Sequence, residues 1–294
     1  MAAPADALTP FVLEHAAVRG AFVCLPRTMA SVLACHPYPP AVARVLAELC
    51  VASALLASTL KFSGSISAQL AGEGPVRLLV VECTASLGIR AMAQWDVAQV
   101  DALPPNAPLA ALAGDAERAR FVLTVDPKDG GAMYQGIVAL ESTSVAGLFE
   151  HYLATSEQLA SRLLLAVEDD DAAGLLLQRL PGASEEDDTA WARARAALEH
   201  VAAEDLAAPE PATDIIARVL AHEDVRVFAG RPVSFACACS RARVENALRI
   251  AGMAEVESIL AEKGFVDVTC EFCNRSYVFS PVEARAVFGP RSAH

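Results

Sequence analysis

Two closely spaced pairs of cysteines near the end of the sequence constrain this chain more than any other feature. Cys237-Ala-Cys239 is followed, after thirty residues, by Cys270-Glu-Phe-Cys273. Two short-spaced thiol pairs at such a separation make a good tetrahedral four-sulfur zinc site. Each pair can also close a disulfide, so the same residues fit either a metal site or a redox pair. The state of these four thiols is therefore expected to decide what the protein does.

The composition describes a folded, acidic protein. The chain has 294 residues, of which 54% are hydrophobic, and this leaves room for two domains with a proper core. Its formal net charge is −13. Because affinity for nucleic acids depends largely on lysine and arginine that neutralise phosphates, we expect no nucleic-acid partner.

The sequence also argues against a membrane. The longest suspect run, Leu49 to Leu60, is twelve residues and is too short to cross a bilayer. The first residues, Met1 to Asp6, lack the basic start and apolar stretch of a secretion signal. We therefore expect a cytoplasmic protein, in a compartment where thiols stay reduced and structural disulfides are rare.

Residues 1–181 are expected to form an α+β core domain that combines an antiparallel sheet with helices. Apolar alanine and leucine positions predict one long, mostly buried helix over Pro40–Lys61, and a shorter one over Ser144–Leu153. Alternating runs bounded by turn residues predict strands. These are a first strand from Phe11 to Val23, then Ser65–Leu70, Val76–Val81, Ile89–Trp95, Phe121–Val125 and Tyr134–Val138, and a closing hairpin of Leu163–Val167 with Leu175–Leu177.

Residues 182–232 differ in character from what precedes them. Between Ala183 and Pro232 there are 11 acidic residues, 5 arginines and three prolines among helix-favouring alanines. We expect few large apolar residues to anchor such a helix, and an isolated helix of this length is marginal in water. We interpret the segment as a metastable, charged helical linker.

Residues 233–294 are expected to form a small C-terminal zinc-binding domain. Helices are predicted over Ser240–Ile250 and Ala254–Glu262, a strand over Ser276–Phe279, and a last helix from Pro281. So short a module cannot bury enough apolar surface to be comfortably stable alone. Zinc contributes ~10–16 kcal/mol in small zinc peptides, so loss of the metal should unfold the module. Thiolate ligands are also the form that oxidants attack.

The remaining sequence offers little chemistry. The other cysteines, Cys24, Cys35, Cys50 and Cys83, lie singly in apolar surroundings and are predicted to be small buried side chains. No nucleotide-binding loop, serine elbow or His-Glu-x-x-His motif is present in the sequence. We therefore expect a binding protein and not an enzyme.

Several motifs along the whole chain resemble one known family. They are Phe11-x-x-Glu14-x-x-x-Val18-Arg19-Gly20, Val45 to Leu49, Gly72-Glu73-Gly74-Pro75, Tyr134-Gln135-Gly136, Ser156 to Leu159, Glu257 to Leu260, and above all Phe235-x-Cys237-x-Cys239-Ser240-Arg241 with Cys270-Glu271-Phe272-Cys273. In these motifs the chain resembles the redox-regulated heat-shock holdases, the 33 kDa chaperonin-like chaperones that act in oxidative stress.

The resemblance implies an ATP-independent molecular chaperone that is inactive when it is reduced and zinc-bound. It implies one Zn²⁺ per chain, held by Cys237, Cys239, Cys270 and Cys273. Oxidation would join neighbours, giving Cys237–Cys239 and Cys270–Cys273 disulfides with release of zinc. The linker would then unfold, the active molecules would form a homodimer, and unfolding client proteins would be held to prevent aggregation. No motif marks the surface that holds clients.

Two other functions fit parts of the sequence. One is a zinc-ribbon protein of a regulatory or nucleic-acid-binding kind, whose cysteines are purely structural. The other is a thiol-disulfide oxidoreductase that uses Cys270 and Cys273, although no βαβ pattern surrounds this pair. Salt-dependent binding of nucleic acid would favour the first, and reduction of insulin without zinc would favour the second.

Overall fold

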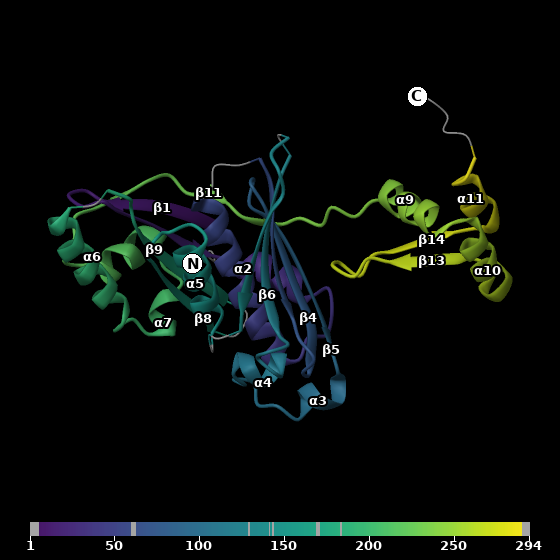
Figure 1. Ribbon diagram of the computed structural model, residues 1–294, viewed down its shortest axis with the longest axis horizontal. Coiled ribbons are helices and arrows are strands. Elements are labelled where there is room, and N and C mark those ends of the chain that lie inside the picture. The colour runs from purple at the N-terminus through teal and green to yellow at the C-terminus, as the bar shows by residue number, and fades with distance from the viewer. Residues whose placement is uncertain are drawn as a thin grey trace. The chain divides into compact units, whose positions relative to one another are not determined.

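The computed structural model describes residues 6–59, 63–128, 130–140, 142, 144–168, 171–182 and 184–289. The chain forms two compact units, Met1–Ala236 and Cys237–His294 (Figure 1). Residues 1–5, which carry the expectation about a secretion signal, lie outside the described residues, and so does the predicted end of the long helix at Leu60 and Lys61.

The first unit contains two sheets and several helices. The first sheet has the strand order β10-β1-β2-β9-β8, with β11 also paired to β1, and the second has the order β12-β5-β4-β3-β6-β7. The strands are β1 (Ala7–Leu13), β2 (Val18–Cys24), β3 (Gly64–Ala71), β4 (Val76–Thr84), β5 (Gly88–Trp95), β6 (Arg120–Pro127), β7 (Tyr134–Ala139), β8 (Ser161–Glu168), β9 (Asp171–Arg179), β10 (Val225–Val227), β11 (Arg231–Pro232) and β12 (Ser234–Phe235). The helices are α1 (Pro26–Leu33), α2 (Pro40–Thr59), α3 (Val97–Asp101), α4 (Leu109–Ala113), α5 (Val145–Thr155), α6 (Glu185–Leu198), α7 (Ala203–Leu206) and α8 (Ala212–Val219).

The sheets confirm the predicted α+β class. Among the described residues of the two sheets, the strand pairings are antiparallel except for β12, which adds two residues parallel to β5. The predicted meander and closing hairpin are present as β3-β4-β5, β6-β7 and β8-β9. The predicted single strand from Phe11 to Val23 is wrong: it is a hairpin of β1 and β2, because the chain turns at residues 14–17, where the Val18 amide bonds to the Ala16 carbonyl.

Helix α2 is the centre of the first unit, and it contacts strands of both sheets (Figure 1). It is apolar around most of its circumference, which is the pattern of a helix buried on all sides. By length and composition it could cross a membrane, with a mean hydropathy of 1.8, but 78% of that stretch is buried inside the protein. The apolar run is therefore longer than the twelve residues considered from the sequence, and packing of the core accounts for it.

One turn shows why a glycine-rich motif occurs in the chain. The Gly72-Glu73-Gly74-Pro75 turn between β3 and β4 lies against the end of α4. A Cβ atom on Gly74 would lie 2.4 Å from the amide nitrogen of Gly114. The motif thus supplies close backbone approach as well as the turn predicted from the sequence.

The predicted linker is helical, but it is better anchored than its composition suggested. Helices α6, α7 and α8 pack on one face of the first sheet and share a hydrophobic cluster with it. Large side chains of these helices are fully buried there, namely Leu198, Leu206, Ile215, Ile216 and Leu220. The expectation that few large apolar residues anchor the segment is therefore wrong, because most of its large apolar residues gather on the side that faces the sheet. The division into residues 1–181, 182–232 and 233–294 stays a prediction.

The second unit is built around a small core. Its elements are α9 (Arg241–Ala251), α10 (Met253–Lys263), β13 (Val266–Thr269), β14 (Ser276–Phe279) and α11 (Pro281–Ala286). Its buried cluster consists of Leu248, Val256, Leu260, Val266, Phe279, Ala284 and Val287. Gly264, with φ of 78°, ends α10 as predicted. Strand β13, which pairs with β14, was missed in the sequence although Val266-Asp-Val-Thr alternates in polarity.

Candidate metal centre

The four clustered cysteines lie on two short segments of the second unit. Cys237 and Cys239 directly precede α9, whose first turn is capped by the Ser240 hydroxyl accepting from the Arg243 amide. Cys270 and Cys273 lie in the tight turn that joins β13 to β14. That turn is closed by backbone bonds between Cys270 and both Asn274 and Arg275. Local backbone structure therefore fixes each pair of thiols before any metal is considered.

The turn brings all four sulfurs together. Their Sγ atoms lie within 4.8 Å of one another, and each residue is half-buried. The Cys237–Cys270 separation is 3.7 Å and the Cys239–Cys273 separation is 3.3 Å. Since zinc–thiolate bonds are ~2.3 Å long, the sulfurs of a tetrahedral site are about 3.8 Å apart. The chemistry and spacing of this donor set therefore fit a zinc ion, and the four residues can hold one.

Two further side chains act on the thiols without having been singled out for this role in the sequence. The Tyr277 hydroxyl donates to Cys239 Sγ at 3.2 Å. Burial favours a raised pKa for Cys239, but hydrogen bonds from Tyr277 and the neighbouring thiols outweigh it and lower the pKa to about 7. Arg275 bonds to Tyr277, and this hydrogen bond, followed by the nearby Cys239 and Cys273, raises the pKa of Arg275. The alternating pattern of β14, which puts Tyr277 and Phe279 on one face, is the signal that could have identified Tyr277.

The lone cysteines mostly match their predicted structural role. Cys24, Cys50 and Cys83 are buried, whereas Cys35 is half-buried. Burial raises the pKa of Cys24 to about 11 and that of Cys83 to about 12, and it also raises the pKa of Cys50. Such thiols are protonated at neutral pH and are poor targets for oxidants.

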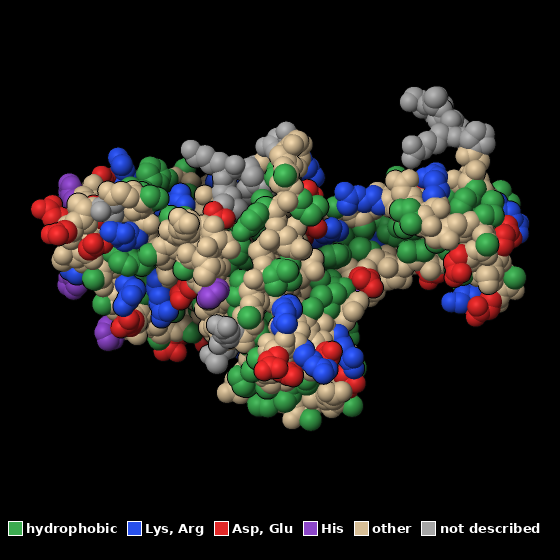
Figure 2. Space-filling model, viewed as in Figure 1, with side chains coloured by type: hydrophobic (Ala, Val, Ile, Leu, Met, Phe, Trp, Pro, Cys, Tyr) green, Lys and Arg blue, Asp and Glu red, His purple; other side chains and the backbone are tan. Residues whose placement is uncertain are grey.

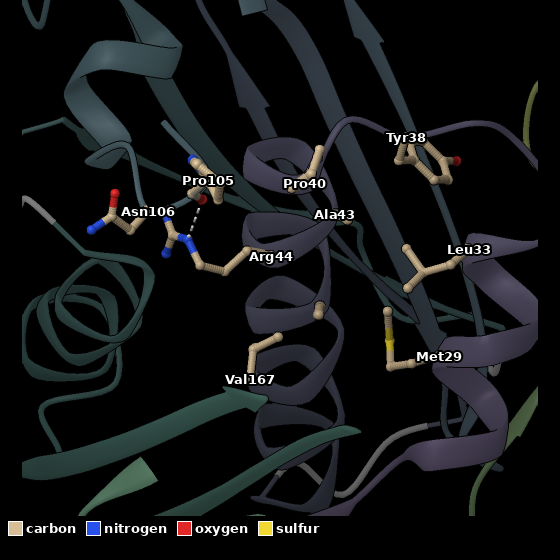
Figure 3. Close-up of a pocket in the computed structure, with 10 residues that line it drawn as sticks. Met29, Leu33, Tyr38, Pro40, Ala43, Arg44, Pro105, Asn106 and Val167 are labelled. Atoms are coloured by element: carbon tan, nitrogen blue, oxygen red, sulfur yellow. Dashed lines mark hydrogen bonds between the residues drawn. The ribbon is translucent and has the colours of Figure 1, made fainter. Parts of the chain in front are cut away.

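A pocket of the first unit has a different character. A pocket of about 680 Å³ opens beside α1 and α2, and its described lining is mostly apolar (Figure 3). Its cation, Arg44, is bound by the Glu48 carboxylate and by the carbonyls of Pro105 and Ala107. The guanidinium therefore serves to hold the 105–107 loop against α2.

The start of the linker is tied to the first sheet by a contact over a long sequence separation. Ser184 and Asp187 form a reciprocal capping box at the start of α6. The second carboxylate oxygen of Asp187 also accepts from the Ala17 amide in the β1–β2 turn at 2.5 Å. An ion pair between Arg179 and Asp188 lies beside it, and charged side chains gather around α6 (Figure 2). The buried side chains of α6 itself are only Ala190, Ala194 and Leu198, so polar contacts carry much of its attachment.

Removal of this cap is expected to loosen α6 selectively. Ser184→Ala deletes the acceptor for the Asp187 amide and should destabilise the helix by about 1 kcal/mol. Native-state hydrogen exchange should show faster exchange in α6 than in α8. Ser280→Ala removes the same capping box from α11 and is the matched control, since it should leave α6 exchange unchanged. Equal exchange of α6 in both variants would contradict this assignment.

The same contact predicts a pH dependence. Hydrogen bonds from the Ala17 amide and then from Ser184 hold the pKa of Asp187 below its usual range. A lowered folded-state pKa stabilises the fold above the unfolded value of ~3.9, and this stabilisation is lost as pH falls through the lowered value. Exchange of α6 amides, corrected for intrinsic rates, should thus be steady from pH 7 to 5 and accelerate below pH ~4. Asp187→Asn should flatten that profile, and an unchanged profile would contradict the contact.

Fold and site together define a class of protein: an α+β unit followed by a separate module whose four thiols can hold a metal. Comparison with known proteins is consistent throughout the chain. The family model described as "Hsp33 protein" matches residues 6–280. The chain therefore belongs to the Hsp33 family of chaperones, as the resemblance in its sequence indicated.

Individual relatives agree with this assignment. The 33 kDa chaperonin of Methylobacillus flagellatus is 40% identical over 285 residues, covering 96% of this chain and 94% of the relative. That of Chromobacterium violaceum is 43% identical over 284 residues, with the same coverage. The crystal structure of the 33 kDa chaperonin (heat shock protein 33 homolog) from Thermotoga maritima has a TM-score of 0.81 at 21% identity, covering 96% of this chain and 97% of that one. This last likeness supports the fold.

Proposed function

We propose that the protein is a redox-regulated, ATP-independent holdase that is inactive when reduced and zinc-bound. Cys237, Cys239, Cys270 and Cys273 would be the ligands of one zinc ion per chain. When bound, the zinc would cross-link the two thiol-bearing segments and supply folding energy to the module. The small buried cluster of the second unit is the reason why it depends on such a cross-link.

Oxidation would remove the cross-link by changing the pairing of the sulfurs. Two neighbouring thiolates would each give up one electron and form an S–S bond, zinc would be released, and hydrogen peroxide would take the two electrons and two protons from solvent to give two waters. A Cys237–Cys239 bond and a Cys270–Cys273 bond each close within one segment and leave the segments untied. Cross pairing, Cys237–Cys270 with Cys239–Cys273, would instead keep the two segments covalently joined. Neighbour pairing is therefore the pairing that would leave the two segments without a cross-link and allow the module to unfold.

The observation that carries the proposal is the apolar sheet face beneath the linker helices. The face contributes Phe11, Phe22, Leu175 and Leu177 to the cluster shared with α6, α7 and α8. All four side chains are at most 1% exposed while the helices are docked. Undocking of the linker would uncover a contiguous hydrophobic surface, which is the chemistry that captures unfolding proteins. The activity is binding without turnover.

Assembly and location complete the proposal. The oxidised form would be a homodimer, because the uncovered apolar face favours association, and its clients would be unfolding proteins. We expect neither nucleic acid nor membrane as a partner, given the net charge of −13 and the burial of α2. Eight cysteines without a disulfide among them are suited to the cytoplasm, where an oxidant is a signal of stress.

Disulfide mapping tests the proposed step directly. The chain is oxidised with peroxide, digested, and its disulfide-linked peptides are identified by mass spectrometry. We expect Cys237–Cys239 and Cys270–Cys273, with Cys24, Cys50 and Cys83 still reduced because they are buried. Predominant Cys237–Cys270 and Cys239–Cys273 bonds would contradict the switch, since the two segments would remain joined.

A further inference from the structure

The last strand of the second sheet presents an unprotected edge. β7 pairs with β6 on one side, and it is the end of the strand order. Among the described residues, no backbone hydrogen bond outside this sheet is made by Tyr134–Ala139. The outer edge of β7 therefore offers amide and carbonyl groups that only another extended chain can pair in register.

The side chains beside this edge are apolar and uncharged. Met133 is 65% exposed, Tyr134 47% and Ile137 64%. The sequence from Gly130 to Leu140 contains no charged residue, within a chain of net charge −13. An uncharged edge imposes no cost of burying a charge on an apolar segment that pairs with it.

The other sheet ends in the described part of the first unit are blunted. β10 is three residues long and carries Arg226, which pairs with Glu14. β12 is two residues long. β8 packs against α5 and α7 and carries Arg162. Short strands, charges and covering helices are the usual protections of an edge. Helix α5 packs on one face of β7, but β7 is six residues long and carries no charged residue.

We propose that β7 is a docking strand for an extended, uncharged apolar segment of an unfolding protein, which adds to the second sheet beyond β7. This rests on the proposed holdase function and names a surface for it. Backbone hydrogen bonds are indifferent to sequence, so strand addition suits clients that share no motif. Met133 and Ile137 provide adaptable apolar contact on alternate positions of such a segment. A second copy of the chain at this edge is the alternative occupant, and the experiment below distinguishes it from a client.

This surface is distinct from the face beneath the linker. β7 is uncovered while α6, α7 and α8 are docked, so it is available in the inactive form as well. One short strand alone gives weak binding. When the linker face also becomes free, a client that occupies both surfaces is held more tightly than by either, because the second contact is intramolecular.

The experiment uses the full-length, reduced, zinc-loaded chain and reduced, carboxymethylated α-lactalbumin as the unfolded probe. We expect the probe to slow amide hydrogen exchange in Tyr134–Ala139 by severalfold, and Ile137→Lys to abolish this effect. Ile250→Lys, at a side chain 88% exposed in the other unit, is the matched control and should behave as wild type. In the oxidised form, Ile137→Lys should require about three- to tenfold more chaperone to suppress client aggregation.

Each other result has a defined meaning. Equal protection and equal suppression by wild type and Ile137→Lys would overturn the docking strand. Slower exchange of β7 at higher chain concentration without the probe would make the edge a self-interface, which also overturns it. If oxidised wild type suppresses no aggregation, the proposed holdase function fails instead. Unchanged zinc content and melting temperature establish that the variant folds, and Met133→Lys, at a second exposed position, repeats the test.

Discussion

Replacement of Cys270 by serine is expected to abolish tight zinc binding and to unfold the second unit of the reduced protein. Three thiols cannot complete the four-sulfur site, and the metal supplies ~10–16 kcal/mol in small zinc modules. The zinc content, measured on purified protein with a chromogenic chelator, should fall from one per chain to near zero. The first unit has its own core around α2 and should stay folded.

The control for this change is Cys35→Ser. Cys35 is half-buried, belongs to the first unit, and donates through its thiol to the Ser31 carbonyl, a bond that a serine hydroxyl can also make. It should keep one zinc per chain. Full metal content in Cys270→Ser would show that the ligand assignment is wrong.

Ile216→Ala is expected to make the chaperone active without oxidant. Ile216 is fully buried between α8 and the first sheet, and such a truncation costs about 2–5 kcal/mol. The loss falls on the linker, because Ile216 belongs to the cluster that docks α6, α7 and α8 on the first sheet. The reduced variant should therefore suppress client aggregation while it keeps its zinc.

Tryptophan fluorescence reports the docking itself. Trp191 of α6 is half-buried against the same cluster, so its emission should shift to the red when the helix leaves. A Trp95→Phe background makes Trp191 the sole tryptophan. Ile250→Ala removes the same atoms from a side chain 88% exposed and should change nothing. Hydrogen exchange in β3–β6 checks that the core of the variant is intact. If the core is intact, an Ile216→Ala variant that suppresses no aggregation and shows no shift in Trp191 emission would contradict the covering role of the linker.

Local features of this protein could be predicted from its sequence. Each local feature has its signal within a short stretch of sequence. Examples are the four cysteines, the glycine that ends α10 and the apolar pattern of the buried helix α2. Non-local features could not be predicted. Asp187 meets the Ala17 amide across 170 positions, and nothing in either segment indicates the other. The anchoring of the linker was underestimated for the same reason, since composition counts apolar residues but does not show that they share one face.

The most direct test of the central claim follows zinc and activity together. Oxidant is titrated into the reduced protein while a chelator measures released zinc and light scattering measures suppression of client aggregation. We predict that holdase activity rises in parallel with zinc release, and that reductant with added zinc reverses both. Zinc release with unchanged holdase activity would show that the zinc site is purely structural and would contradict the switch. Zinc release followed only by precipitation of the protein would have the same meaning.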